Sequence, residues 1–193
     1  DRKAATRIHR SQIAALLREV ADLLELRGEN PFRSRAYANG ARAIEGMAED
    51  PQDLYEAGTL GEVRGIGPGL VAGIAEIVLT GSLALLTELR AEFPPGVQDL
   101  LRIPGLGPKR LRVLLAELGI ESPAALERAC REGRVAALPG FGAKSQEKLL
   151  QGLSSLQRFG ERHLLPVART AAEALAKHLR THPAVGEAEI AGS

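Results

Sequence analysis

The sequence predicts an all-α fold in which pairs of helices are joined by short glycine-rich hairpins. Its apolar residues are mostly Leu, Ala, Ile and Val, and they recur at helical spacing along most of the chain. Aromatic residues make up only 3% of the chain, which does not favour a β-sandwich. A Gly-apolar-Gly pattern occurs three times, each time ahead of a segment with helical periodicity. The alternation typical of a strand appears at residues 187–190.

The composition limits the kind of protein. A length of 193 residues allows one or two domains with a real core, and 45% hydrophobic residues exclude a disordered chain. The net charge is +1, so any basic surface for nucleic acid must be local. The single Cys130 excludes an internal disulfide and is expected to be a packed thiol on a helix. The sequence shows no signal peptide and no apolar run long enough for a bilayer.

The first half of the chain carries clear helix boundaries. An amphipathic helix is expected over residues 11–26, with Gly28 ending it. A second helix is expected over residues 32–47, after an Asn-Pro turn. Asp50 followed by proline caps a short third helix, and Thr59 to Glu62 matches a capping box that opens a further one.

The remaining helices follow from proline, serine and glycine. Helices are expected over residues 68–79, 108–118 and 143–156, each directly after one Gly-apolar-Gly pattern. Ser82 is expected to cap the helix after the first of these, and Ser122 to cap the helix that carries Cys130.

Two interruptions divide the chain. Pro94-Pro95 and Phe159-Gly160 are the predicted boundaries, because proline and glycine do not continue a helix. They give units at 1–93, 94–160 and 161–193. The third unit begins with an amphipathic segment at 167–179. The chain begins without Met and stops at Gly-Ser, so we expect a piece of a longer protein.

The three glycine patterns are named here hairpin 1 (65–67), hairpin 2 (105–107) and hairpin 3 (140–142). Glycine lets each turn adopt positive φ, and the apolar residue between the glycines can point inward and join the two flanking helices. The second helix of each pair then opens with unbonded N–H groups, which suit a phosphate. A single match is equally typical of an ordinary tight turn, but three together resemble the helix-hairpin-helix motif, which binds the DNA backbone without reading sequence.

Basic residues follow two of the hairpins. Lys109, Arg110 and Arg112 follow hairpin 2, and Lys144 and Lys148 follow hairpin 3, whereas Arg64 precedes hairpin 1. Hairpin 1 is therefore expected to bind more weakly, through its backbone. The predicted DNA-binding residues of the three hairpins are Gly65, Ile66, Gly67, Gly69, Gly105, Leu106, Gly107, Lys109, Arg110, Gly140, Phe141, Gly142 and Lys144.

Arg33 and Tyr37 share one face of the second predicted helix, at i and i+4. A basic group beside a hydroxyl could hold a phosphate. Spacing alone favours a non-functional interpretation, in which this is a solvated helix face with Tyr37 partly packed.

The sequence offers no catalytic constellation. Asp99 is the last aspartate, and a metal-dependent phosphoryl-transfer site needs clustered carboxylates. His178 and His182 are four residues apart but lack further ligands, so no metal site and no catalytic residue are expected in this chain.

Taken in order, these segments resemble the amino-terminal part of a bacterial family X DNA polymerase. Residues 30–37 resemble a helix of that family's small amino-terminal domain, and hairpins 1 and 2 resemble the hairpins of its first two domains. Residues 138–144 are similar to a Gly-rich segment of bacterial members, and 158–162 to the approach to the palm. Residues 190–193 resemble the first palm strand of this α/β nucleotidyltransferase domain.

The resemblance implies template-directed gap filling in DNA base excision repair. Arg33 and Tyr37 match residues that hold the downstream 5′-phosphate, which reverses the preference for a solvated face. Gly192 and Ser193 match the start of a motif that contacts the phosphates of the incoming deoxynucleoside triphosphate. Mg²⁺ or Mn²⁺ would serve the parent polymerase without binding here, and a monovalent cation could be shared at the hairpins. The implied partner is gapped or nicked duplex DNA.

The resemblance also implies what this piece lacks. The catalytic palm aspartates and the carboxy-terminal PHP exonuclease domain of bacterial members are not within it. Gly73 stands where some members carry a lysine that forms a Schiff base with a 5′-deoxyribose phosphate, and Gly69 where they carry a phosphate-binding lysine. We therefore expect no efficient lyase activity. The expected protein is a monomer of the bacterial cytoplasm, associated with the nucleoid and not with a membrane.

Three alternatives remain open. A non-catalytic tandem helix-hairpin-helix module of a junction-binding protein or nuclease subunit explains the hairpins equally well, but not residues 30–37 or the terminal Gly-Ser. A hairpin-containing DNA glycosylase would need an Asp after its hairpin, and none follows Asp99. A helical scaffold without nucleic acid leaves the basic residues after two hairpins unexplained.

Overall fold

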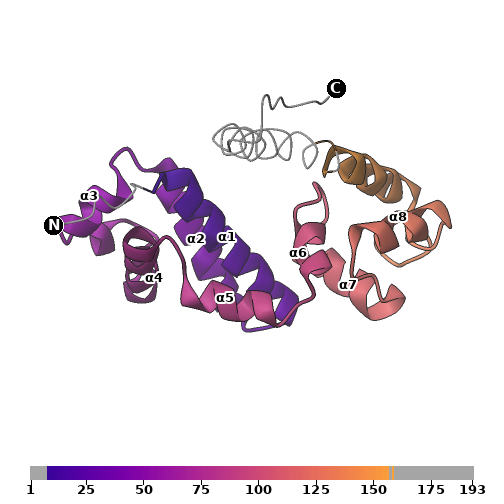
Figure 1. The fold of residues 1–193 in the computed structure, drawn as a ribbon, viewed down its shortest axis with the longest axis horizontal. Helices are drawn as coiled ribbons and strands as arrows, with labels where there is room; N and C mark the ends of the chain where they lie inside the picture. The colour runs from indigo at the N-terminus through magenta and orange to yellow at the C-terminus, as the bar shows by residue number, and fades with distance from the viewer. Residues whose placement is uncertain (1–7, 157, 159–193) are drawn as a thin grey trace, which may run out of the picture.

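The computed structural model describes residues 8–156 and 158, and within them all regular secondary structure is helical (Figure 1). The predicted all-α fold is thereby confirmed for this part of the chain. The predicted strand at 187–190, the helix at 167–179, the histidine pair, Gly192 and Ser193 lie outside the described residues. Along the chain the helices are α1 (Arg10–Arg27), α2 (Pro31–Gly46), α3 (Pro51–Glu56), the 3-10 helix η1 (Leu60–Glu62), α4 (Pro68–Thr80), α5 (Ala84–Ala91), α6 (Pro95–Leu101), α7 (Pro108–Leu118), α8 (Pro123–Arg131) and a helix over residues 143–156.

The first half is built on the long pair α1 and α2, which lie side by side, with α4 and α5 packed against α1 (Figure 1). One apolar face of each helix is buried, as the helical periodicity predicted. The largest fully buried side chains of this core are Ile13, Leu17, Leu23, Leu24, Ile44, Leu60, Ile74, Ile77 and Leu89.

The second half packs α6, α7, α8 and the 143–156 helix around a separate core. Its buried members include Leu100, Ile103, Leu111 and Leu126. Cys130 is buried there too, as predicted, and burial raises its pKa to about 11. Leu26 of α1 also belongs to this second core, so α1 reaches from one core into the other.

Most predicted helix ends are where their capping residues place them. Asn30 accepts a hydrogen bond from the Phe32 N–H, Asp50 from the Gln52 N–H, and Ser122 from the Ala125 N–H. Gly28 and Gly119 end α1 and α7 in the left-handed conformation. The caps at Asp50 and Ser122 and the glycine stops are local in sequence, which is why the pattern predicted them; Asn30 had been predicted only as part of a turn.

Two predicted caps are wrong. Thr59 makes no capping bond and Leu60–Glu62 is a single 3-10 turn: the Thr59 backbone is helical, not extended as an N-cap requires, and its hydroxyl donates to the Leu54 carbonyl. Ser82 precedes the actual N-cap of α5, Leu83. The Ala84 N–H is instead bound by the Glu76 carboxylate at 2.7 Å, an acceptor from the preceding helix α4.

Among the described residues, no single helix is long and apolar enough to cross a membrane. The pair α4 and α5 reaches that length and composition together but is bent by 92°.

Candidate nucleic-acid interface

The three hairpins share one backbone design. Their first glycines, Gly65, Gly105 and Gly140, have φ of 97°, 85° and 81°. These values lie in the left-handed region, where a Cβ would be strained. In each hairpin the N–H of the next residue donates to the carbonyl three residues back, at 3.0, 3.0 and 3.1 Å. The sequence repeat is therefore a structural repeat.

The apolar residue between the glycines is buried in all three turns. Ile66 is 3% exposed, Leu106 2% and Phe141 8%. Ile66 belongs to the first core, and Leu106 and Phe141 to the second. Each turn is thus held by an apolar side chain packed in a hydrophobic core, while its glycines are exposed at the surface.

The helices after hairpins 1 and 2 begin without a side-chain cap. Gly67 and Gly107 occupy the N-cap positions of α4 and α7, and neither supplies an acceptor for the first-turn N–H groups. Pro68 and Pro108 follow, each at the first helical position. The positive end of both helix dipoles is therefore left for an external anion. Hairpin 3 differs, since Gly142 has a positive φ of 89° and Ala143 follows it.

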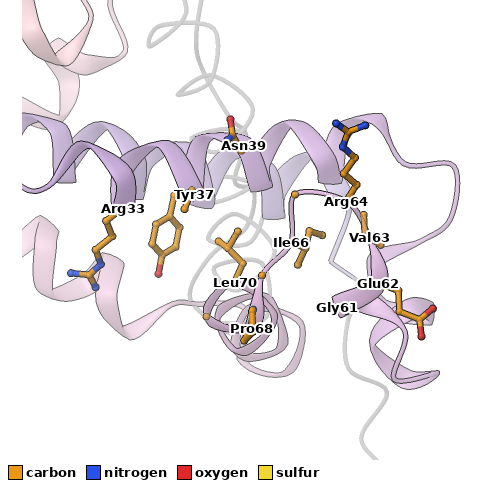
Figure 2. Close-up of a pocket in the computed structure, with 14 residues that line it drawn as sticks. Arg33, Tyr37, Asn39, Gly61, Glu62, Val63, Arg64, Ile66, Pro68 and Leu70 are labelled. Atoms are coloured by element: carbon orange, nitrogen blue, oxygen red, sulfur yellow. The ribbon is translucent and has the colours of Figure 1, made fainter.

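Hairpin 1 and α2 line a cavity of about 820 Å³ that is open to solvent. Arg33 and Tyr37 line it from α2, and Gly65, Gly67 and Gly69 line it from the hairpin side. Figure 2 shows Arg33 and Tyr37 extending from α2 on the side where α4 begins, whereas Arg64 points away from them. The structure thus places the Arg33–Tyr37 pair of α2 beside the glycines of hairpin 1, a proximity that the sequence had indicated only through the family resemblance.

A close contact fixes hairpin 1 on α2. A Cβ built on Gly40 of α2 would lie 2.8 Å from Cδ1 of Leu70, in the first turn of α4. Only a glycine lets α4 approach α2 this closely without displacing the leucine. Arg33 forms an ion pair with Glu29 at 3.2 Å, and Glu29 also binds Arg27. A phosphate entering the cavity would compete with Glu29 for Arg33.

The basic residues after hairpin 2 face different partners. Lys109 is largely exposed and lies 3.7 Å from Glu25 of α1. Arg112 packs against the carboxy-terminal end of α1, where a Cβ on Gly28 would meet its Nη1 at 3.3 Å. Arg110 reaches the carbonyl groups of Gly105 and Gly140. The sequence placed these cations beside the turn, but their pairing depends on elements distant in sequence.

The described residues contain no group of three or more His, Cys, Asp or Glu side chains that could hold a metal ion. Gly73, which stands where a lyase lysine would be, is buried and does not line the cavity; a Cβ there would meet Leu83 at 3.6 Å.

Three repeated hairpins, two of them followed by an uncapped helix start, have the geometry of the helix-hairpin-helix motif. Residues 8–83 match the family described as a helix-hairpin-helix domain, and residues 97–155 match the SAM-like helix-hairpin-helix tandem. The described part of the chain therefore carries tandem helix-hairpin-helix domains.

The chain is also similar to a curated protein. It is 35% identical, over 186 residues and 96% of its length, to the DNA polymerase/3'-5' exonuclease PolX of Bacillus subtilis (strain 168). The predicted resemblance to an amino-terminal part of a bacterial family X DNA polymerase is confirmed by this match. The chain spans about a third of the length of that relative, 32%.

Sequence reasoning missed two features of the site. Asn39 also lines the cavity, and no sequence pattern singled it out; Arg64, which the sequence had placed just before hairpin 1, lines the cavity as well. The bridging position of Arg110 was equally hidden, because it depends on hairpin 3 lying next to hairpin 2.

Proposed function

We propose that this chain is the DNA-binding portion of a family X DNA polymerase that fills short gaps during repair. The observation that carries the proposal is the 820 Å³ cavity, in which Arg33 and Tyr37 lie beside the glycines of hairpin 1. A cation, a phenol hydroxyl and the N–H groups of a helix start suit a terminal phosphate. The downstream 5′-phosphate of a gap is such a group.

Hairpins 1 and 2 then grip the backbone on the two sides of the gap, and hairpin 3 adds a second contact to the duplex. The proposed contacts use backbone N–H groups, Lys109 and Lys144, with a monovalent cation shared between turn carbonyls and phosphate; hard cations take such oxygen ligands. Because these groups contact phosphates, binding is independent of base sequence.

The catalytic functions belong to the parent protein. There Mg²⁺ or Mn²⁺ and a deoxynucleoside triphosphate take part in nucleotide addition, and Gly192 and Ser193, which lie outside the described residues, begin the motif proposed to contact the triphosphate. A 3′–5′ exonuclease domain, a cytoplasmic nucleoid-associated location and a monomeric state are parts of the same proposal. The described residues offer no carboxylate cluster that would fit the catalytic metals.

The test is a fluorescence-anisotropy salt series with this chain. The ligands are a one-nucleotide-gapped duplex with a 5′-phosphate, the same duplex without the phosphate, and an intact duplex. We expect a preference for the phosphorylated gap and, if four phosphates are engaged, a slope of log affinity against log salt of roughly −3 to −4.

Arg33→Ala and Tyr37→Phe should reduce the preference for the 5′-phosphate. Arg35→Ala is the matched control, because Arg35 is an exposed arginine of the same helix that does not line the cavity and contacts only the Phe32 ring in the described structure. Equal, salt-sensitive binding of the wild-type chain to all three ligands would instead favour a generic helix-hairpin-helix module of a junction-binding protein or nuclease subunit.

We further propose that the chain has no efficient deoxyribose-phosphate lyase activity by the Schiff-base route, since positions 69 and 73 are glycines without an amine. Borohydride trapping on an incised abasic duplex should give no efficient adduct, and trapping at the rate of an active lyase would contradict this.

A further inference from the structure

Arg110 lies between the turns of hairpins 2 and 3. Its Nη1 donates to the Gly105 carbonyl at 3.4 Å, and its Nη2 donates to the Gly140 carbonyl at 3.5 Å. Its guanidinium carbon also lies 5.5 Å from the centre of the Phe141 ring, a cation–π distance. One side chain of α7 therefore contacts both turns.

The two carbonyl groups occupy equivalent places. Gly105 and Gly140 are the first glycines of their hairpins and share the left-handed conformation, with φ of 85° and 81°. Arginine can engage both because its planar guanidinium presents several N–H donors in a fixed fork. A lysine ammonium has the same charge but not this geometry.

In hairpin 1 the position equivalent to Arg110 also attaches the turn to a neighbouring element, but through an apolar side chain. Counted from the first glycine, Leu70 corresponds to Arg110. Leu70 is buried and fixes hairpin 1 on α2 through the close approach at Gly40. In both hairpins this position attaches the turn to its neighbouring element, by apolar packing in one and by hydrogen bonds in the other.

A close packing contact on the core side also connects hairpins 2 and 3. A Cβ on Gly152, in the 143–156 helix, would lie 2.7 Å from Ile103 Cγ2 and 3.3 Å from the Pro104 carbonyl oxygen. The helix after hairpin 3 thus rests directly on the residues that lead into hairpin 2. Leu106 and Phe141 share one core.

Lys109 and Lys144 also occupy equivalent positions, two residues after the second glycine of their hairpins. We propose that Arg110 is a positioning residue that holds hairpins 2 and 3 in one fixed orientation, so that Lys109 and Lys144 engage a single duplex together. This rests on the DNA-binding function proposed above. It assigns Arg110 the task of joining two binding turns in place of a simple phosphate contact.

The contact itself is tested without DNA, by amide hydrogen exchange of the whole chain. In Arg110→Met the amides of Leu138 and Phe141, which are hydrogen-bonded within the turn of hairpin 3, should exchange at least about threefold faster than in the wild type. The turn then opens without first having to break its hydrogen bond to Arg110. Arg128→Met, at an exposed arginine of α8, is the control and should leave these amides unchanged. Unchanged exchange in Arg110→Met, in a variant that melts like the wild type, would overturn the bridge.

Its role in binding is tested by a double-mutant cycle on an intact duplex. Arg110→Lys keeps the charge yet should weaken binding about five- to tenfold, since the fork geometry is lost. If Arg110 acts through hairpin 3, Lys144→Ala should reduce the affinity for duplex by a clearly smaller factor in the Arg110→Lys background than in the wild type. The proposal would be overturned if Lys144→Ala reduced affinity by the same factor in both backgrounds, or if Arg110→Lys bound duplex as tightly as the wild type.

The two assays separate the failure of this inference from failure of the proposed function. A wild-type chain that binds no duplex at low salt contradicts the DNA-binding function, while the exchange result still decides whether Arg110 joins the hairpins.

Discussion

At the residue scale, the buried apolar residue of each hairpin matters more for stability than its exposed neighbours. Leu106 is almost completely buried between two surface glycines. Leu106→Ala should lower the free energy of unfolding by about 2–5 kcal/mol, because it leaves a cavity in a packed core.

Urea denaturation followed by circular dichroism measures this loss. Leu79→Ala is the control, since Leu79 is 65% exposed. Its substitution should change the free energy of unfolding by less than about 0.5 kcal/mol. Similar losses in the two variants would mean that Leu106 does not anchor hairpin 2.

Asp22 gives a pH-dependent prediction. Burial raises the pKa of its carboxyl from the ordinary 3.8 to about 6, and the nearby Glu25 adds to the shift while Arg18 opposes it. Between pH 3.8 and about 6, the Asp22 carboxyl of the folded state therefore keeps its proton, whereas that of the unfolded state has already released it. Stability is lost as the pH rises through this window, and the full cost is present above pH 6.

Asp22→Asn removes that titration. At pH 7.5 the variant should be more stable than the wild type by about 1 kcal/mol, a figure reduced for screening of a partly exposed group. The advantage should shrink toward pH 4. Thermal unfolding across this range measures it, and a difference that does not vary with pH would contradict the assignment.

At the element scale, the sequence predicted helices well wherever a start or stop residue acts on its own backbone. Pro68, Pro108 and Pro123 begin helices as expected. The prediction failed at Thr59 because its backbone is helical, and at Ser82 because the Glu76 carboxylate of α4 binds the Ala84 N–H in place of a local cap. A capping pattern cannot reveal that competition.

Packing between elements gives the next prediction. Gly152→Ala should lower the free energy of unfolding by about 1–3 kcal/mol, because its Cβ would overlap the branched side chain of Ile103. Gly46→Ala is the matched control. That glycine ends α2 with nothing within 4 Å of a Cβ, so alanine there should be neutral or stabilising by about 0.5 kcal/mol.

Chemical denaturation of both variants decides this prediction. If Gly152→Ala is as stable as Gly46→Ala, the 143–156 helix does not rest closely on the residues leading into hairpin 2. Affinity for an intact duplex, measured on the same samples, should fall only for Gly152→Ala, because that substitution alone moves the two hairpins relative to each other.

At the scale of the whole molecule, α1 connects the two cores. Most of its buried residues, Leu17 among them, belong to the first core, whereas Leu26 belongs to the second. Leu26→Ala should therefore accelerate amide exchange in helices of both halves, because it loosens the connection between them. Leu17→Ala should act mainly within the first half.

Hydrogen exchange read by mass spectrometry distinguishes these patterns. Acceleration confined to one half in Leu26→Ala would show that the two cores open independently, in spite of the shared helix.

The sequence by itself determined the helical class, the three hairpins and most helix ends, because glycine, proline and capping side chains act within a few residues of their own position. It also connected Arg33 and Tyr37 with phosphate binding through family resemblance. Only the tertiary structure decided that these two residues share a cavity with hairpin 1 and that Arg110 joins hairpin 2 to hairpin 3. Those relations join residues far apart in the chain, and they depend on close approaches at Gly40 and Gly152 that periodicity does not encode.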